Sequence, residues 1–287
     1  MTTEYALTLC DVAARDVAGV SLALMPGEVA GVVGPAGAGK STLLAIAAGS
    51  IASDAGEARV YGIPVMSAAG RRLVGYAREH PGFPSAVTVK EALLYYARLH
   101  RTANEIAIVQ EALDLAGLGA AGGLRVSALG RADLHRLALA QAVLGQRRVL
   151  LLDEIFSGLD AIARRDLRGR IAYIASTGVA VLLAARDPVA LERLAARVFV
   201  MRGGQIVRAG SLGALLAERV LEVVLDAPPA QAPPGFRVTA SGLEASLAGR
   251  TPEAALAMCR AHRLAVRASR VRVKSLEEIV LETHDPR

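Results

Sequence analysis

The stretch Gly34 to Thr42, which reads GPAGAGKST, constrains this chain more than any other. It fits the phosphate-binding loop pattern G-x-x-x-x-G-K-[ST]. Glycines let consecutive backbone N–H groups turn toward a polyphosphate, the lysine supplies a positive charge for the β- and γ-phosphates, and the serine hydroxyl can hold Mg²⁺. A turn that merely joined a strand to a helix would not need Lys followed by Ser. The predicted nucleotide cradle consists of Gly34, Pro35, Ala36, Gly37, Ala38, Gly39, Lys40, Ser41 and Thr42.

The residues around this loop strengthen the prediction, because a phosphate-binding loop lies between a buried strand and a helix. Val29 to Val33 is a short β-branched run, and Thr42 to Ala48 is an uninterrupted helix-forming run. The positive N-terminal end of that helix would face the phosphates. Further strands and helices alternate along the chain, which predicts a mainly parallel α/β core.

Composition limits the classes of protein to consider. With 287 residues the chain can form more than one compact unit. No apolar run approaches the ~18 residues that span a bilayer, and the N-terminus lacks the pattern of a secretory signal, so we expect a soluble, cytoplasmic chain. The net charge of +6 could favour nucleic acid, an anionic membrane surface or no specific partner. The few aromatic residues argue against binding of single-stranded nucleic acid, and we expect no nucleic-acid partner. Cys10 and Cys259 show no metal-ligand spacing.

The chain is predicted to contain two domains. The first covers residues 1–212 and includes a helical subdomain at about 86–146; the second covers 213–287 and is a small α/β unit. In the first domain we expect a helix at 188–196 and a hairpin over Gly203 and Gly204. In the second, Thr251 and Pro252 begin a helix, and Ser275 caps a last helix over 276–284. We find no catalytic constellation in the second domain.

Two consecutive carboxylates follow the apolar run Val149 to Leu152. Asp153, at the end of this predicted strand, can reach Mg²⁺, and Glu154 can polarise an attacking water. Asp-Glu after a strand is a weak signal by itself. Together with the upstream phosphate-binding loop and the segment Ser157 to Asp160, which reads SGLD, it becomes specific.

In these motifs and their order the chain resembles the nucleotide-binding subunits of ATP-binding cassette (ABC) transporters. The resemblance covers about residues 5–212. It implies a RecA-like core with a helical subdomain, and two cassettes that close head to tail on two ATP molecules with Mg²⁺. It also implies transmembrane permease partners, whose coupling helices dock near the loop after Tyr76, and a peripheral location on the cytoplasmic face of the membrane. The C-terminal segment VKSLEEIVLE is similar to the accessory domain of ABC-2 exporters.

Several positions depart from the pattern of this family. By spacing, the signature segment Leu-Ser-Gly-Gly-Gln corresponds to Leu129 to Asp133, which reads LGRAD. The serine hydroxyl is lost, a glycine has become Arg131, and Asp133 adds a negative charge. Arg131 could instead replace the lost phosphate contact. No aromatic residue suited to stacking on adenine precedes the loop.

Two further departures concern the predicted γ-phosphate and metal site. The switch histidine corresponds to Arg186, which can only donate hydrogen bonds and could still contact a γ-phosphate. The usual glutamine corresponds to Glu79, which keeps an oxygen ligand for Mg²⁺. The resemblance therefore predicts Glu154 as the catalytic base. It predicts Ser41, Asp153 and Glu79 as metal ligands. It also places Glu79, Asp153 and Arg186 in the nucleotide site.

These departures predict a second, non-identical nucleotide-binding subunit. In a homodimer both composite sites would contain the altered signature. In a heterodimer, the phosphate-binding loop of this chain would face the intact signature of its partner. Three hypotheses follow: a transport-coupled ATPase, a catalytically weak or regulatory nucleotide-binding subunit paired with an active cassette, and a non-transport cassette in translation or DNA repair. The last would be marked by tandem cassettes or a long coiled-coil insertion, and the sequence contains neither.

Overall fold

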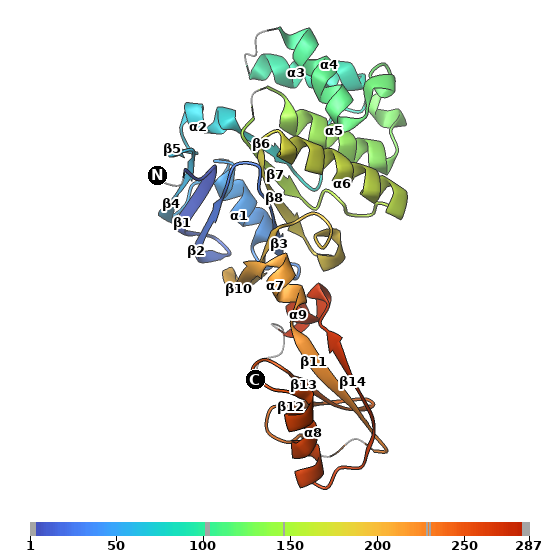
Figure 1. Cartoon of the computed structure of the whole chain (residues 1–287). Coiled ribbons are helices and arrows are strands. Elements are labelled where there is room, and N and C mark those ends of the chain that lie inside the picture. Colours follow the sequence, from blue (N-terminus) through green and yellow to red (C-terminus); the bar gives the residue numbers. More distant parts are fainter. Residues whose placement is uncertain (1–3, 101–103, 146, 228, 230, 283–287) are drawn as a thin grey trace. The chain divides into compact units, whose positions relative to one another are not determined.

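The computed structural model describes residues 4–100, 104–145, 147–227, 229 and 231–282. The chain divides into two compact units between Ala209 and Gly210, close to the predicted boundary after residue 212. Figure 1 shows the elements of both units. None of the helices in the described part of the chain has the length and apolar character needed to cross a bilayer.

The N-terminal unit is built on a six-stranded sheet with the order β10-β9-β3-β8-β7-β6. Strands β6, β7, β8, β3 and β9 pair in parallel, as predicted for an α/β core. Parallel strands covered by helices are buried on both faces, which explains why β3, β7 and β8 are continuous apolar runs. The bounds in sheet order are Gln205–Ser211, Arg197–Arg202, Val29–Val33, Ala180–Ala185, Val149–Asp153 and Val74–Ala77.

A second sheet, which the sequence did not predict as a separate layer, has the order β2-β1-β4-β5. Its strands are antiparallel and alternate buried and exposed residues over much of their length. This alternation is typical of a sheet with one face on the core. The bounds in sheet order are Val17–Leu24, Leu7–Ala14, Ala55–Val60 and Ile63–Pro64.

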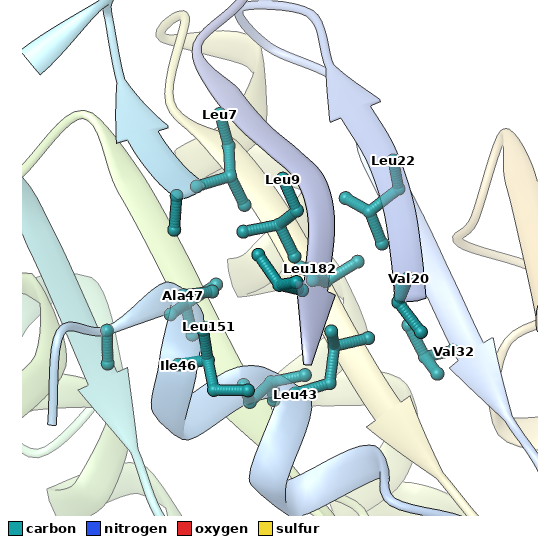
Figure 2. Close-up of a cluster of buried hydrophobic side chains, with 14 of the residues drawn as sticks. Leu7, Leu9, Val20, Leu22, Val32, Leu43, Ile46, Ala47, Leu151 and Leu182 are labelled. Atoms are coloured by element: carbon teal, nitrogen blue, oxygen red, sulfur yellow. The ribbon is translucent and has the colours of Figure 1, made fainter. Parts of the chain in front are cut away.

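Helix α1 (Lys40–Ala47) lies between these two sheets. Figure 2 shows its Leu43 and Ile46 in one buried cluster with Leu9 and Leu22 of the four-stranded sheet and Leu182 of the six-stranded sheet. Six of its eight residues are buried. A helix that is apolar all round must be covered all round. The lack of a polar face in the sequence TLLAIAA is therefore explained by this position.

Helices α5 and α6 lie over the opposite face of the six-stranded sheet, whereas α2 contacts β4, β5 and β6. Leu150 of β7 lies in one cavity wall with Val143 of α5 and Ile174 of α6, whereas Leu151 points into the α1 cluster. Helices α3, α4 and α5 pack around their own buried cluster, which is the predicted helical subdomain region (Figure 1). The bounds of α2 to α6 are Ala68–Leu73, Val89–Leu99, Glu105–Ala116, Arg131–Val143 and Ala161–Ser176.

One predicted helix of this unit is wrong. Residues 188–196 form a short 3-10 helix, Pro188–Ala190, followed by turns. Asp187 caps this turn through the Val189 N–H, but Ala196 already donates to the carbonyl of Val29. The chain has to join the sheet there to begin β9, so a longer helix does not fit. Two further 3-10 turns, Gly119–Ala121 and Val126–Ala128, lie between α4 and α5.

The C-terminal unit contains a four-stranded antiparallel sheet with the order β12-β13-β11-β14. Helix α8 covers one face, where Ala255 and Cys259 join the apolar side chains of β11 and β13. Thr251 caps α8 with Pro252 in its first turn, and Ser275 caps α9, both as predicted. The predicted residues 283 and 284 of the last helix lie outside the described residues. Bounds are Phe236–Thr239, Gly242–Ser246, Arg219–Leu225 and Val266–Val273 in sheet order, with α7 at Leu212–Leu216, α8 at Pro252–Ala261 and α9 at Leu276–Glu282.

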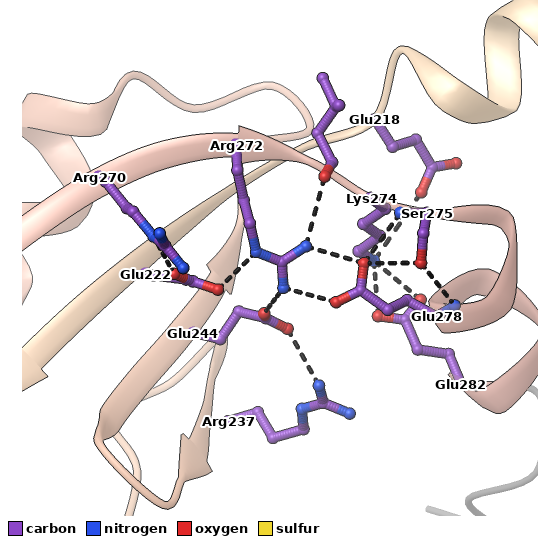
Figure 3. Close-up of polar contacts among 11 residues, drawn as sticks. Glu218, Glu222, Arg237, Glu244, Arg270, Arg272, Lys274, Ser275, Glu278 and Glu282 are labelled. Atoms are coloured by element: carbon purple, nitrogen blue, oxygen red, sulfur yellow. Dashed lines mark hydrogen bonds and ion pairs between the residues drawn. The ribbon is translucent and has the colours of Figure 1, made fainter.

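The other face of this sheet carries a network of charged side chains (Figure 3). Glu222 on β11 and Glu244 on β13 are direct cross-strand neighbours, an arrangement that like charges alone would destabilise. Arg272 contacts both of them and also Glu278 of α9. Arg270 and Arg237 bind the outer sides of Glu222 and Glu244. Hydrogen bonds from Arg270 and Arg272 lower the pKa of Glu222.

We predict that Arg272→Leu destabilises the C-terminal unit by about 3 kcal/mol, because buried Glu244 then faces Glu222 without the cation between them. Hydrogen exchange of β11 and β13 in the full chain measures this change. Because the pKa of Glu222 is lowered in the folded state, its contribution is present at neutral pH and is lost as the pH falls below 4.5 through the folded pKa. Arg267→Leu, on the exposed part of the same strand, is the control and should change stability by less than about 0.5 kcal/mol. Equal effects of the two substitutions would contradict the role of the network.

Candidate functional site

The predicted phosphate-binding loop closes around the amine of Lys40. This residue begins α1, and its Nζ donates to the carbonyls of Gly34 at 2.7 Å and Pro35 at 2.9 Å. Burial lowers the pKa of Lys40, while the nearby Glu154 raises it. A cavity of about 230 Å³ lies beside this loop and is lined by its residues 36–42 together with Glu154, Arg186 and Asp16. The loop, the helix N-terminus and a buried amine therefore converge on one cavity, which suits a polyphosphate.

Asp153 holds a buried oxygen beside Ser41 and is not among the described residues that line this cavity. It is the last residue of β7, and its Oδ1 has no hydrogen-bond partner among the described residues. Burial raises the pKa of this carboxyl, and a hydrogen bond with the Ser41 side chain lowers it. An unpaired carboxylate oxygen beside a hydroxyl is the hard oxygen donor set that Mg²⁺ prefers. The residues present thus fit the predicted metal.

These residues do not enclose a metal by themselves. Within the described residues, no group of three or more His, Cys, Asp or Glu side chains is placed to hold a metal ion. Mg²⁺ in nucleotide sites usually has one or two carboxylates and completes its shell with waters and substrate phosphates. Ser41 and Asp153 satisfy that requirement from the protein side.

Glu154 directly follows β7, and its backbone is bound to the neighbouring strand β8. Its backbone is in the left-handed region with φ of 51°, and its N–H donates to the carbonyl of Ala184 at 3.0 Å. Its carboxylate accepts from the backbone N–H and from Nε of Arg186, both at 3.2 Å. Burial raises the pKa of Glu154, and its bonds to Arg186 lower it. Such a strained residue at the edge of a cavity is typical of a functional site.

Arg186 connects two of the predicted residues. Besides Glu154, its guanidinium contacts the carboxylate of Glu79, which follows β6. Glu79 is not among the described residues that line the cavity beside the loop. The prediction that Glu79 holds Mg²⁺ therefore stays a prediction, since the bond described for its carboxylate is with Arg186.

The segment Leu129 to Asp133 lies at the start of α5. Gly130 is the N-cap residue and offers no side-chain cap. Arg131 follows and is exposed, and its guanidinium lies against Gly158, where an added Cβ would come within 2.1 Å of Nη1. Asp133 pairs with Arg136 at 2.8 Å and lies in the first helical turn, where a negative charge is favourable. The charge of Asp133 is thus compensated within the chain, which the sequence did not predict.

Asp16 is a residue of the cavity that the sequence did not indicate. It lies in the turn between β1 and β2. Two residues later, the N–H of Ala18 donates to the carbonyl of Gly204, in the turn between β9 and β10, at 2.9 Å. No motif marks this turn. Among the described residues that line the cavity there is no aromatic ring.

The geometry defines a P-loop nucleotide-binding protein with an ATPase-type pair of carboxylates. The family model described as ABC transporter matches residues 17–157. The chain is 33% identical over 208 residues to the Nod factor export ATP-binding protein I of Rhizobium etli, and 34% identical over 208 residues to that of Paraburkholderia xenovorans. Each match covers 71% of this chain, and they cover 66% and 68% of the two relatives.

Solved structures show the same fold. CbiO1 from Clostridium perfringens, part of the ABC transporter complex cbiONQ, aligns with a TM-score of 0.67 at 22% identity and covers 75% of this chain and 91% of its own. The ADP conformation of an ATP-binding cassette of an ABC transporter, MJ1267, aligns with a TM-score of 0.66 at 18% identity over 74% of this chain and 95% of its own. The chain belongs to the family of ABC transporter ATP-binding subunits. Cassettes of this family bind ATP and pair with permease subunits.

The loop glycines provide a test of this nucleotide site. Gly39 has φ of 93°, and an added Cβ would lie 2.6 Å from the carbonyl oxygen of Asp16. Gly37 has φ of 77°, but no described atom lies within 4 Å of such a Cβ. We predict that Gly39→Ala lowers ATP affinity at least about tenfold, because the backbone of the loop or of the Asp16 turn must move to make room for the methyl group. Gly37→Ala should retain ATP binding and cost only about 1–2 kcal/mol of folding stability through backbone strain. Titration calorimetry with ATP measures both. Equal losses of affinity would contradict the described loop geometry.

Proposed function

We propose that this chain holds Mg-ATP at its own P-loop, uses Glu154 as the general base, and drives an ABC-2-type exporter as one of two non-identical cassettes. It would act peripherally on the cytoplasmic face of the membrane, bound to the permease. The observation that carries the catalytic part is the buried Oδ1 of Asp153, which has no described partner and lies beside Ser41 at the loop.

The proposed roles follow from position and charge. Lys40 and the N-terminus of α1 would bind the β- and γ-phosphates, and Ser41 and Asp153 would hold Mg²⁺, which neutralises phosphate charge when bound. Glu154 lines the same cavity and is held at two oxygens by Arg186, so it can orient a water and accept its proton. Arg186 also lines the cavity and can donate to a γ-phosphate.

The direction of transport is proposed from the relatives, which are named as export proteins. The predicted accessory unit, with its Ser275-capped last helix, supports the ABC-2 branch. The transported substrate would be set by the permease subunits, which are the membrane-spanning partners that the family resemblance implies.

The proposal of a non-identical partner is supported by the segment Leu129 to Asp133. Gly130 has no hydroxyl, and exposed Arg131 carries a long side chain where the family pattern has glycine. This segment would contact the partner's nucleotide in a closed pair of cassettes. An intact signature on the partner would then complete the site at Gly34 to Thr42 in this chain.

A regulatory role is the second candidate, and the same segment favours it. In that case the chain would bind ATP with little turnover, and its partner would carry the chemistry. The compensated charge of Asp133 weighs toward the catalytic role, as do Lys40 and Glu154 in the cavity and Asp153 beside Ser41.

We predict that Glu154→Gln reduces ATP hydrolysis by the assembled transporter at least about a hundredfold while ATP remains bound, because the carboxylate that accepts the proton is lost. Turnover and retained nucleotide are measured on the same complex. Glu57→Gln, an exposed carboxylate on β4, is the control and should leave turnover unchanged. Turnover that survives Glu154→Gln would favour the regulatory candidate.

We also predict that the native complex contains this chain together with a different cassette. Mass spectrometry of the intact purified transporter counts the subunits. Two identical copies of this chain with rapid ATP hydrolysis would contradict the non-identical pairing.

A further inference from the structure

The contacts of Arg186 form a chain of three side chains at the edge of the site. Its Nε donates to Glu154 Oε1 at 3.2 Å, while its other guanidinium end contacts Glu79 Oε1. The side chain of Arg186 is 51% exposed, that of Glu79 24%, and that of Glu154 only 9%. A half-exposed arginine thus connects a nearly buried carboxylate to a second one farther from the cavity.

We propose that Glu79 is a positioning residue: it anchors the guanidinium of Arg186, and Arg186 in turn orients the carboxylate of Glu154. This inference rests on the proposed catalytic role of Glu154, and it gives Glu79 a role other than the predicted metal ligand. Glu79 would then affect turnover without contacting nucleotide or Mg²⁺.

The shape of the guanidinium supports this anchoring. Its donors are fixed in a planar fork, so a carboxylate bound at one side determines the direction of the other. With Glu79 in place, Nε is directed at Glu154 Oε1, and the backbone N–H of Arg186 binds Oε2. Without Glu79, one end of a half-exposed side chain would be free, and rotation about its long stem would weaken the bond to Glu154.

Charge compensation points the same way. Asp153, Glu154 and Glu79 all act electrostatically on Lys40, together with Arg186. Three carboxylates near one buried amine would repel one another, and Arg186 lies between two of them. Because Glu79 and Arg186 carry opposite charges, the pair adds a directed contact to the site without changing its net charge. The two departures from the family pattern at these positions therefore compensate each other.

A double-mutant cycle separates anchoring from metal binding. The variants are Glu79→Gln, Arg186→Gln and the double variant, each in the full chain. We measure kcat, KM for ATP and the Mg²⁺ concentration at half-maximal rate in the assembled transporter. We also measure the unfolding temperature of the isolated chain without nucleotide or Mg²⁺.

If Glu79 anchors Arg186, Glu79→Gln lowers kcat roughly fivefold or more and leaves KM and the Mg²⁺ midpoint unchanged. The double variant is then no slower than Arg186→Gln, because the anchor has nothing left to hold. The unfolding temperatures of the nucleotide-free chain show the same lack of additivity. Asp187→Asn is the matched control: it removes a carboxylate next to Arg186 that binds Arg164 instead, and its effect should add to that of Arg186→Gln.

The opposite result is equally definite. If Glu79→Gln raises the Mg²⁺ midpoint, and does so by the same factor with and without Arg186, Glu79 is a metal ligand and the anchoring inference is wrong. If the wild-type transporter shows no turnover that depends on Glu154, the proposed function fails instead. The unfolding temperatures still decide whether Glu79 and Arg186 are coupled.

Discussion

The burial of α1 between two sheets is the constraint on which the site depends. The helix brings Leu43, Ile46 and their neighbours into a cluster with both sheets, and this packing fixes where the helix begins. Because Gly39 and Lys40 form that beginning, the loop is held against the strand before it and against the turn at Asp16. A cradle made of backbone N–H groups is useful only if the backbone is rigid, and here the hydrophobic core supplies the rigidity.

The carboxylates reach the loop by the topology of the parallel sheet. β7 and β8 are neighbours and run in parallel, so Asp153, Glu154 and Arg186 emerge at the same edge. Glu79 follows β6, which pairs with β7, and comes to the same edge. Three carboxylates and one guanidinium, from three separate parts of the sequence, therefore meet beside Lys40. The positive charge of Arg186 offsets part of the repulsion among the carboxylates.

The charged face of the C-terminal sheet has a different character from the nucleotide site. Its charges bind one another: Arg272 lies between Glu222 and Glu244, and Arg237 and Arg270 complete the row. In the nucleotide site, by contrast, Asp153 keeps a buried oxygen without a described partner. Saturated charges stabilise a fold, whereas an unsaturated one beside the phosphate-binding loop is available to a ligand.

The sequence by itself determined the loop, the strand and helix around it, the parallel core and the membership of the family, because these depend on local residue patterns of fixed spacing. The tertiary structure alone decided which residues Arg186 and Glu79 contact, since their partners are distant in the chain and follow from the order of the strands. It also decided that Asp133 pairs with Arg136 and that residues 188–196 turn back into β9 instead of continuing as a helix. Local propensity gave way there because the chain had to pair with β3, and a sheet register is set by residues that no local pattern contains.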